Sequence, residues 1–243
     1  MTSANTGGVC DTAWGCHHFD LPSLANGSIR ACRVSVSDVA KLANELTRTV
    51  VDTSWMSSLD KGARRAYEIT VAETAELLVA IFKAAASPSL VSEDFGELMV
   101  SMGSARALNM LFSHNEVPLA ELWKPQVKQN EGFDFHTLCP GGLVNFGEAK
   151  YSSAANPHGS ALNQISDFLA AEKHYRDRTH LVNIVPASAI GKLDNEEFGV
   201  IAAFSLNAVN HELVIRNAIN SAGKLAKKHK ISQIFIVGVS YDA

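Results

Sequence analysis

Apolar residues recur at spacings of three and four through much of the first half of the chain, which is the period of an amphipathic helix. The pattern predicts helices over residues 39–51, 61 to about 86, and 93–112. Asp60 and Ser92 directly precede two of these segments, and both residue types cap helix N-termini well. The first half is therefore expected to be mainly helical.

The second half alternates short apolar runs with amphipathic stretches. Its pattern predicts strands over residues 131–138, 143–151, 180–187 and 231–240, and helices over residues 159–175 and 207–230. Proline and two glycines at 140–142 indicate a tight turn between the first two strands. A hairpin followed by strand–helix–strand units predicts an α/β fold class. We expect residues 1–90 to form a helical N-terminal region that packs on a body formed by residues 91–243.

Composition places the chain among globular proteins, since 47% of its 243 residues are hydrophobic and 19% are charged. It contains no apolar run of membrane-spanning length and no secretory signal pattern, so we expect a cytoplasmic protein without a membrane partner. The formal net charge is −4. Contact with a nucleic acid would therefore depend on a local patch or on a partner protein, because bulk attraction to phosphate requires a basic chain.

The four cysteines include Cys10 and Cys16, which lie close to the adjacent His17 and His18. Their spacing matches none of the common zinc patterns. We therefore interpret this part of the chain as an irregular segment with reduced thiols.

The predicted hairpin carries the main candidate for chemistry. If its turn is centred on Gly141, Asp134 faces Glu148 across the two strands, with Cβ atoms about 4.5–5.5 Å apart. Lys150 lies two residues beyond Glu148 and so shares its face. An exposed strand with a surface ion pair is the simpler alternative. Two facing carboxylates repel each other, however, unless a proton or a cation lies between them.

Oxygen ligands at one end of a strand pair suit Mg²⁺, which keeps several of its waters, and Mn²⁺ is an alternative with similar preferences. Lys150 could then orient an attacking water or balance charge on a phosphate. His136 shares the predicted face of Asp134, but we interpret it as a packing residue with one hydrogen bond. No glycine-rich nucleotide-binding loop is present in the sequence.

The order Asp134, Glu148, Ala149, Lys150 resembles the signature of the PD-(D/E)xK nuclease superfamily. The resemblance implies a restriction-endonuclease-like core, in which a mixed sheet containing the hairpin is flanked by helices. It also implies that Asp134, Glu148 and the backbone carbonyl of Ala149 bind the metal, and that Lys150 assists the attacking water.

Two further residues are assigned by the same resemblance. Glu97, on the helix before the hairpin, is similar to a metal-linked glutamate of the family, and Gln164, on the helix after it, is similar to the glutamine of a Q-x-x-x-Y motif. The chain departs from the family pattern at two positions. Phe168 stands where the motif has tyrosine, and Phe133 stands where proline usually precedes the aspartate.

A narrower resemblance covers roughly residues 92–185, where FGEL, GFDFHT, FGEAKY and SALNQISDFL are similar to the nuclease subunit of Hachiman antiphage-defence systems. It implies a deoxyribonuclease that works with a superfamily 2 helicase, which would supply most of the contact with DNA. The leading prediction is thus a Mg²⁺-dependent deoxyribonuclease in a defence complex. A binding module without catalysis on the same fold and an RNA-cleaving nuclease are the alternatives.

Overall fold

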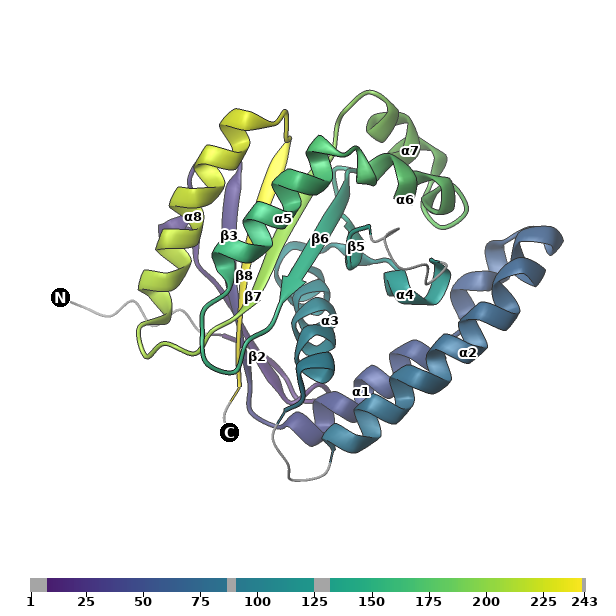
Figure 1. Cartoon of the computed structure of the whole chain (residues 1–243), viewed down its shortest axis with the longest axis horizontal. Helices are drawn as coiled ribbons and strands as arrows, with labels where there is room; N and C mark the ends of the chain where they lie inside the picture. Colours follow the sequence, from purple (N-terminus) through teal and green to yellow (C-terminus); the bar gives the residue numbers. More distant parts are fainter. Residues whose placement is uncertain (1–7, 87–90, 125–131, 242–243) are drawn as a thin grey trace.

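The computed structural model describes residues 8–86, 91–124 and 132–241 as one mixed sheet flanked by helices (Figure 1). The eight strands of the described segments have the order β1-β2-β3-β8-β7-β6-β5-β4. They are β1 (Val9–Asp11), β2 (Cys16–Asp20), β3 (Ile29–Val36), β4 (Asn115–Glu116), β5 (Phe135–Leu138), β6 (Val144–Lys150), β7 (Gly199–Ser205) and β8 (Gln233–Tyr241). The α/β fold class is confirmed.

The helices are α1 (Val39–Val51), α2 (Lys61–Ala85), α3 (Glu93–Phe112), α4 (Ala120–Trp123), α5 (His158–Ala170), α6 (Lys173–Leu181), α7 (Ala187–Asp194) and α8 (His211–Lys228), with short 3-10 turns η1 (Pro22–Leu24) and η2 (Ser54–Ser58). Among the described helices, none combines the length and the hydrophobicity that a bilayer crossing requires.

The middle of the sheet is parallel: β6, β7, β8 and β3 run in one direction, whereas β5 and β4 on one side and β2 and β1 on the other are antiparallel to their neighbours. Every residue of β7 is buried, as in a strand covered on both faces. Phe204 of β7 contacts His158 of α5, whereas Phe235 of β8 points to the other face and contacts Phe112 of α3. Helices α5 and α3 therefore cover opposite faces of the sheet.

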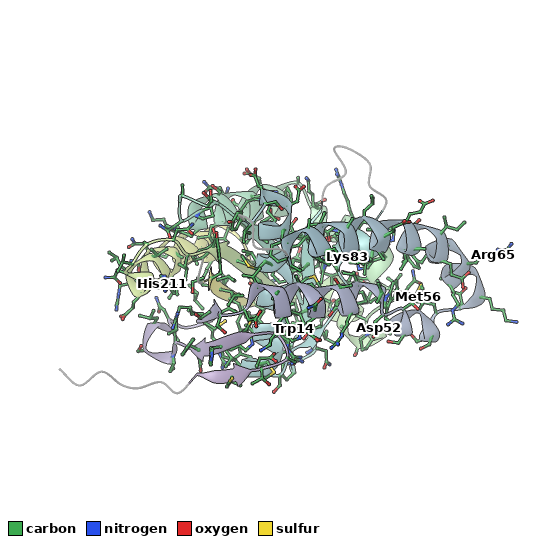
Figure 2. The ribbon with its side chains drawn as sticks, turned by 90° about the horizontal axis from the view of Figure 1, so that it is seen from below. Trp14, Asp52, Met56, Arg65, Lys83 and His211 are labelled. Carbon is green, nitrogen blue, oxygen red and sulfur yellow. The ribbon has the colours of Figure 1, made fainter. Side chains whose placement is uncertain are left out.

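Helices α1 and α2 lie side by side and extend away from the sheet as an arm, with Arg65 near its outer end (Figures 1 and 2). Both helices begin where the sequence predicts. The side chain of Asp38 accepts a hydrogen bond from the backbone N–H of Lys41, and that of Asp60 accepts two at the start of α2. These caps satisfy backbone donors that the helices leave unpaired.

Three expectations for secondary structure are wrong. The run from Cys10 to His18, expected to be irregular, contributes to β1 and β2. Residues 29–36, in the region expected to be helical, form β3 between β2 and β8. Residues 180–187, expected to be a strand, contain the end of α6 and a turn. Apolar density alone does not distinguish a short strand from a buried helix end. The next strand along the chain is β7, in a stretch to which the sequence pattern assigned no element.

The other predicted elements are confirmed, with shifted ends: the hairpin, and the helices and strand that correspond to α3, α5, α8 and β8. The helix expected over residues 159–175 stops at Ala170, because Glu172 adopts a left-handed conformation with φ 53°. Glu131, in the first predicted strand, lies outside the described residues. The division expected at residue 90 does not coincide with a break in the sheet, which takes strands from both sides of it.

A buried histidine gives a testable pH dependence of stability. His114 is buried, and its Nδ1 lies 2.9 Å from Thr137 Oγ1. Burial, followed by the positive charge of Arg30, lowers the pKa of His114 to about 4. Between that value and the ordinary pKa near 6.5, the unfolded chain binds a proton that the folded chain does not, so stability falls as the pH falls through this window.

We expect the wild type to lose up to about 3 kcal/mol of unfolding free energy from this group between about pH 6.5 and pH 4. Urea unfolding of wild type and His114→Gln across that range measures the effect, and the variant should show the shallower slope. Equal slopes would contradict the assignment.

Candidate metal centre

The predicted register of the hairpin is confirmed. Phe135 pairs with Gly147 and Leu138 with Val144, as a turn centred on Gly141 requires. Asp134 lies just before β5, ahead of the first ladder pair, and its backbone N–H donates to the carbonyl of Gly147 at 2.9 Å. The side chain of Asp134 also reaches the backbone of β6.

Asp134 Oδ2 accepts a hydrogen bond of 2.8 Å from the backbone N–H of Ala149. The N–H and C=O of a residue in an extended strand point to the same side. The carbonyl of Ala149 therefore faces the side on which Asp134 lies, as a metal-binding carbonyl there requires.

Glu148 and Lys150 form a close ion pair at the end of β6. Oε1 of Glu148 lies 2.8 Å from Lys150 Nζ, and the Glu148 side chain is 0% exposed. When both carboxyls are ionised, Oε2 of Glu148 receives no hydrogen bond from any described residue. A buried carboxylate oxygen without a donor is costly, so this atom is available to a cation or a proton.

Burial, followed by the charge of Asp134, raises the pKa of Glu148 well above its ordinary value. Burial also raises the pKa of Asp134, although the hydrogen bond from Ala149 opposes this. Burial alone would lower the pKa of Lys150, but the charge and hydrogen bond of Glu148 together with the charges of Asp134 and Glu97 outweigh it, and the pKa lies above the usual value. Two carboxyls that resist ionisation thus lie beside an amine that stays protonated.

Glu97 approaches this pair from α3. Glu97 is exposed, yet partial desolvation raises its pKa, and the charges of Lys150 and Asp134 act on it next, in opposite directions. The start of α3 lies against the end of β6 because Gly96 has no side chain: a Cβ there would lie 2.3 Å from the ring of Tyr151. The residue before Glu97 therefore fixes how closely α3 approaches the site.

Glu121, in the four-residue helix α4, is a further carboxylate near the site that the sequence analysis missed. Burial, followed by the charge of Asp134, raises its pKa to about 7, and Glu97 adds to the shift. Its Oε2 is buried without a hydrogen-bond partner among the described residues. No motif surrounds Glu121, so only the folded chain reveals its position.

The two remaining candidates are not brought into this group. Gln164 lies half-buried on α5, and no hydrogen bond of the described residues joins it to Asp134, Glu148 or Lys150. His136 is fully buried and lies 3.0 Å from Asp177, and its role as a packing residue is confirmed.

The donor set fits a divalent cation of the Mg²⁺ type. The described residues contain no group of three or more His, Cys, Asp or Glu placed closely enough to enclose a metal ion. A Mg²⁺ ion keeps several waters and needs only one or two carboxylates from the protein. Asp134, Oε2 of Glu148 and the carbonyl of Ala149 could supply these ligands.

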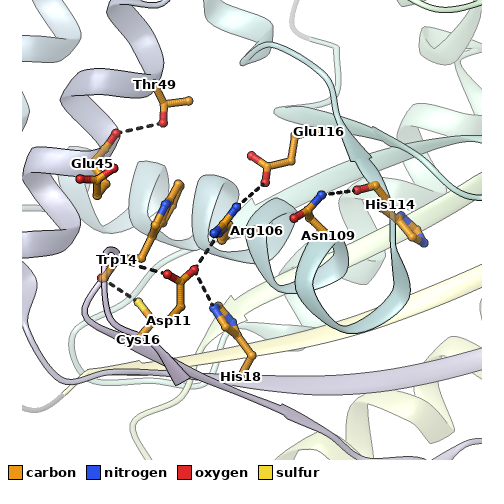
Figure 3. A network of polar contacts seen from close by, with 10 residues as sticks. All are labelled: Asp11, Trp14, Cys16, His18, Glu45, Thr49, Arg106, Asn109, His114 and Glu116. Atoms are coloured by element: carbon orange, nitrogen blue, oxygen red, sulfur yellow. Dashed lines mark hydrogen bonds and ion pairs between the residues drawn. The ribbon is translucent and has the colours of Figure 1, made fainter. Parts of the chain in front are cut away.

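The cysteine–histidine run near the N-terminus does not form a comparable site. Cys10, Cys16, Cys32 and Cys139 are all free thiols. Cys16 donates to the carbonyl of Trp14, and His18 lies beside Asp11. These contacts belong to a buried polar network between β1, β2 and α3 (Figure 3).

Comparison with known proteins adds nothing to this geometry, because no protein-family model, no curated protein and no solved structure matches the chain.

Proposed function

We propose that the chain is a Mg²⁺-dependent deoxyribonuclease of the PD-(D/E)xK type. The observation that carries the proposal is the place of Asp134 at the end of the hairpin, where its carboxylate accepts from the backbone N–H of Ala149 at 2.8 Å, between Glu148 and Lys150, which lie 2.8 Å apart. The order helix α3, hairpin β5–β6 and helix α5 also agrees with the core that the resemblance implies. A structural ion pair alone would not need a second buried carboxyl beside it.

In this function, Asp134, Glu148 and the Ala149 carbonyl hold the cation, which when bound polarises the phosphate and lowers the pKa of its water. Lys150 is protonated at neutral pH and can donate hydrogen bonds to the attacking water or to a phosphate oxygen. Glu97 and Glu121 lie within the electrostatic influence of Asp134, so ionisation of these carboxyls on cation binding would add negative charge that favours the cation.

The proposal extends to the setting of the enzyme. The sequence resemblance to Hachiman nuclease subunits supports a role as the effector of an antiphage-defence complex with a superfamily 2 helicase. The net charge of −4 agrees with a partner that provides much of the contact with DNA. The partner is tested by co-expression with a superfamily 2 helicase of a Hachiman system, followed by size-exclusion chromatography.

The decisive experiment is incubation of the purified protein, alone and with that helicase, with matched DNA and RNA in the presence of Mg²⁺, Mn²⁺ or chelator. Cleavage of DNA that stops on chelation supports the proposal. Cleavage of RNA alone favours a ribonuclease. Absence of cleavage together with absence of calorimetric heat on adding Mn²⁺ favours a binding module.

The raised pKa values predict how Mg²⁺ changes stability. Without a cation, carboxyls such as Glu121, whose pKa is about 7, keep a proton in the folded chain after the unfolded chain has lost it. Stability therefore falls as the pH rises from about 4.5 through the raised values. A cation that binds the ionised carboxyls must displace these protons, so its affinity increases with pH.

We therefore expect Mg²⁺ to raise the melting temperature more at about pH 8 than at about pH 5.5. Differential scanning fluorimetry measures both shifts. Glu148→Gln is the control, since it removes a ligand charge and should abolish most of the effect. A Mg²⁺ shift that is independent of pH would contradict the assignment.

A further inference from the structure

Asp177 of α6 connects a helix to the strand that carries the proposed metal ligand. Its side chain is 3% exposed and makes three polar contacts. Oδ1 lies 2.9 Å from Lys124 Nζ, while Oδ2 lies 3.0 Å from His136 Nε2 and accepts from the backbone N–H of Phe133 at 3.2 Å. Phe133 lies just before β5 and His136 within it, whereas Lys124 lies at the end of α4.

Lys124 completes the arrangement from the end of α4. Its Nζ donates to the carbonyl of Phe133 at 2.5 Å. Both backbone polar groups of Phe133 are thus held by side chains, because this residue precedes the first ladder pair of β5. The ring of Phe133 packs against Phe146 and Phe168, so the side chain of this residue is held as well as its backbone.

Gly132 shows how closely the chain is held. A Cβ at this position would lie 2.2 Å from Asp177 Oδ1 and 2.7 Å from Lys124 Nζ. The ion pair therefore occupies the space that any side chain at residue 132 would need. The ion pair is thus in close contact with the backbone of Gly132, directly before Phe133.

Asp134 directly follows Phe133 in the chain. Its carboxylate accepts a hydrogen bond from the backbone N–H of Ala149, although Asp134 lies outside the regular ladder of β5. Resting on the proposed function, we infer that Asp177 and Lys124 are positioning residues, which clamp Phe133 and thereby set the place of the Asp134 carboxylate at the metal site. They act through the backbone and need not touch the metal or the substrate.

The chemistry of the pair supports a positioning role more than a stabilising one. Burial would raise the pKa of Asp177, but the hydrogen bonds and charges of His136 and Lys124 together outweigh it and the pKa lies below its usual value, so the carboxylate is charged. Burial lowers the pKa of His136. A buried ion pair repays little of its desolvation cost in stability, and its main effect is to select one geometry.

The chain offers a matched control at the opposite end of the sheet. Asp11 of β1 is 5% exposed and accepts from Arg106 Nε at 2.7 Å (Figure 3). Asp177→Asn and Asp11→Asn thus each remove one charge from a buried aspartate–cation pair. Only the first pair adjoins Asp134.

The experiment measures the dissociation constant of Mn²⁺ by titration with electron paramagnetic resonance, at a temperature where circular dichroism shows each variant folded. We expect Asp177→Asn to weaken Mn²⁺ binding about 10- to 100-fold, as loss of an outer-shell partner does at other metal sites, and Asp11→Asn to change it less than about twofold. Both variants should lower the melting temperature. Saturating Mn²⁺ should restore much of the DNA cleavage by Asp177→Asn, because the groups that act on the water and phosphate remain.

Gly132→Ala is the second test, because it retains every charge and displaces the backbone against Asp177. It should also weaken Mn²⁺ binding, and it replaces Asp177→Asn if that variant does not fold. Equal Mn²⁺ affinity in wild type and in the folded clamp variants would overturn the positioning role alone. Failure of the wild type to bind Mn²⁺ would overturn the proposed function, and the clamp with it.

Discussion

Replacing Lys150 by alanine is expected to lower the rate of DNA cleavage by about 10²- to 10⁴-fold, the range that a positioned proton donor contributes. The fold should survive, because the lysine side chain is 22% exposed and lies at the end of β6. The rate constant at saturating Mg²⁺, measured on a labelled DNA duplex, checks the prediction. Lys150→Arg should recover little activity, because its planar guanidinium differs in shape from an ammonium.

Lys230→Ala is the matched control, because Lys230 also pairs with a glutamate, Glu196, at 3.2 Å but on the surface. It should cleave DNA at the wild-type rate. A Lys150→Ala variant that retains wild-type cleavage would remove the proposed mechanism. Glu148→Gln tests the neighbouring carboxyl: it should abolish cleavage, because it removes the charge of a proposed metal ligand.

Replacing Gly96 by alanine is expected to cost about 1–3 kcal/mol of unfolding free energy, the usual effect of forcing extra atoms into a packed core, or somewhat more. The new Cβ would lie 2.3 to 2.6 Å from three atoms of the Tyr151 ring. Helix α3 must then retreat from β6 and carry Glu97 with it. Urea unfolding measures the loss, and the Mn²⁺ affinity should fall in the same variant.

Gly103→Ala on the same helix separates the clash from helix propensity. A Cβ at Gly103 meets no atom within 4 Å, so this variant should gain up to about 1 kcal/mol, as alanine does over glycine in helices. Gly96→Ala combined with Tyr151→Ala should lose less than the sum of the two single changes, because the clash is gone. Additive losses would contradict the packing argument.

The hairpin and its register could be predicted from sequence because local signals determine both. Proline and glycines at 140–142 fix the turn, and side-chain alternation then places Asp134 beside Glu148. Helix α3 could also be predicted from sequence, because Ser92 is a good capping residue and its side chain accepts from the backbone N–H of Phe95. These elements need no information from distant parts of the chain.

The rest of the site depends on distant contacts. Glu121 and Asp177 reach the hairpin from short helices, α4 and α6, whose own residues carry no motif. Strand β7 was missed because burial on both faces removes the alternation that marks a strand. Strand β3 was missed although it does alternate in part, and its partner β8 lies about two hundred residues away.

The pairing of β3 with β8 constrains the order in which the protein can fold during synthesis. Strand β8 is inserted between β7 and β3, so residues 29–36 have no parallel neighbour until residues 233–241 have been synthesised. A ribosome-bound chain can assemble β4 to β7 with the candidate catalytic groups. Strands β1 to β3, however, cannot join this sheet until β8 has been synthesised. Shortening the chain by residues 233–243 would leave two separate sheets with exposed edges, which are prone to aggregation.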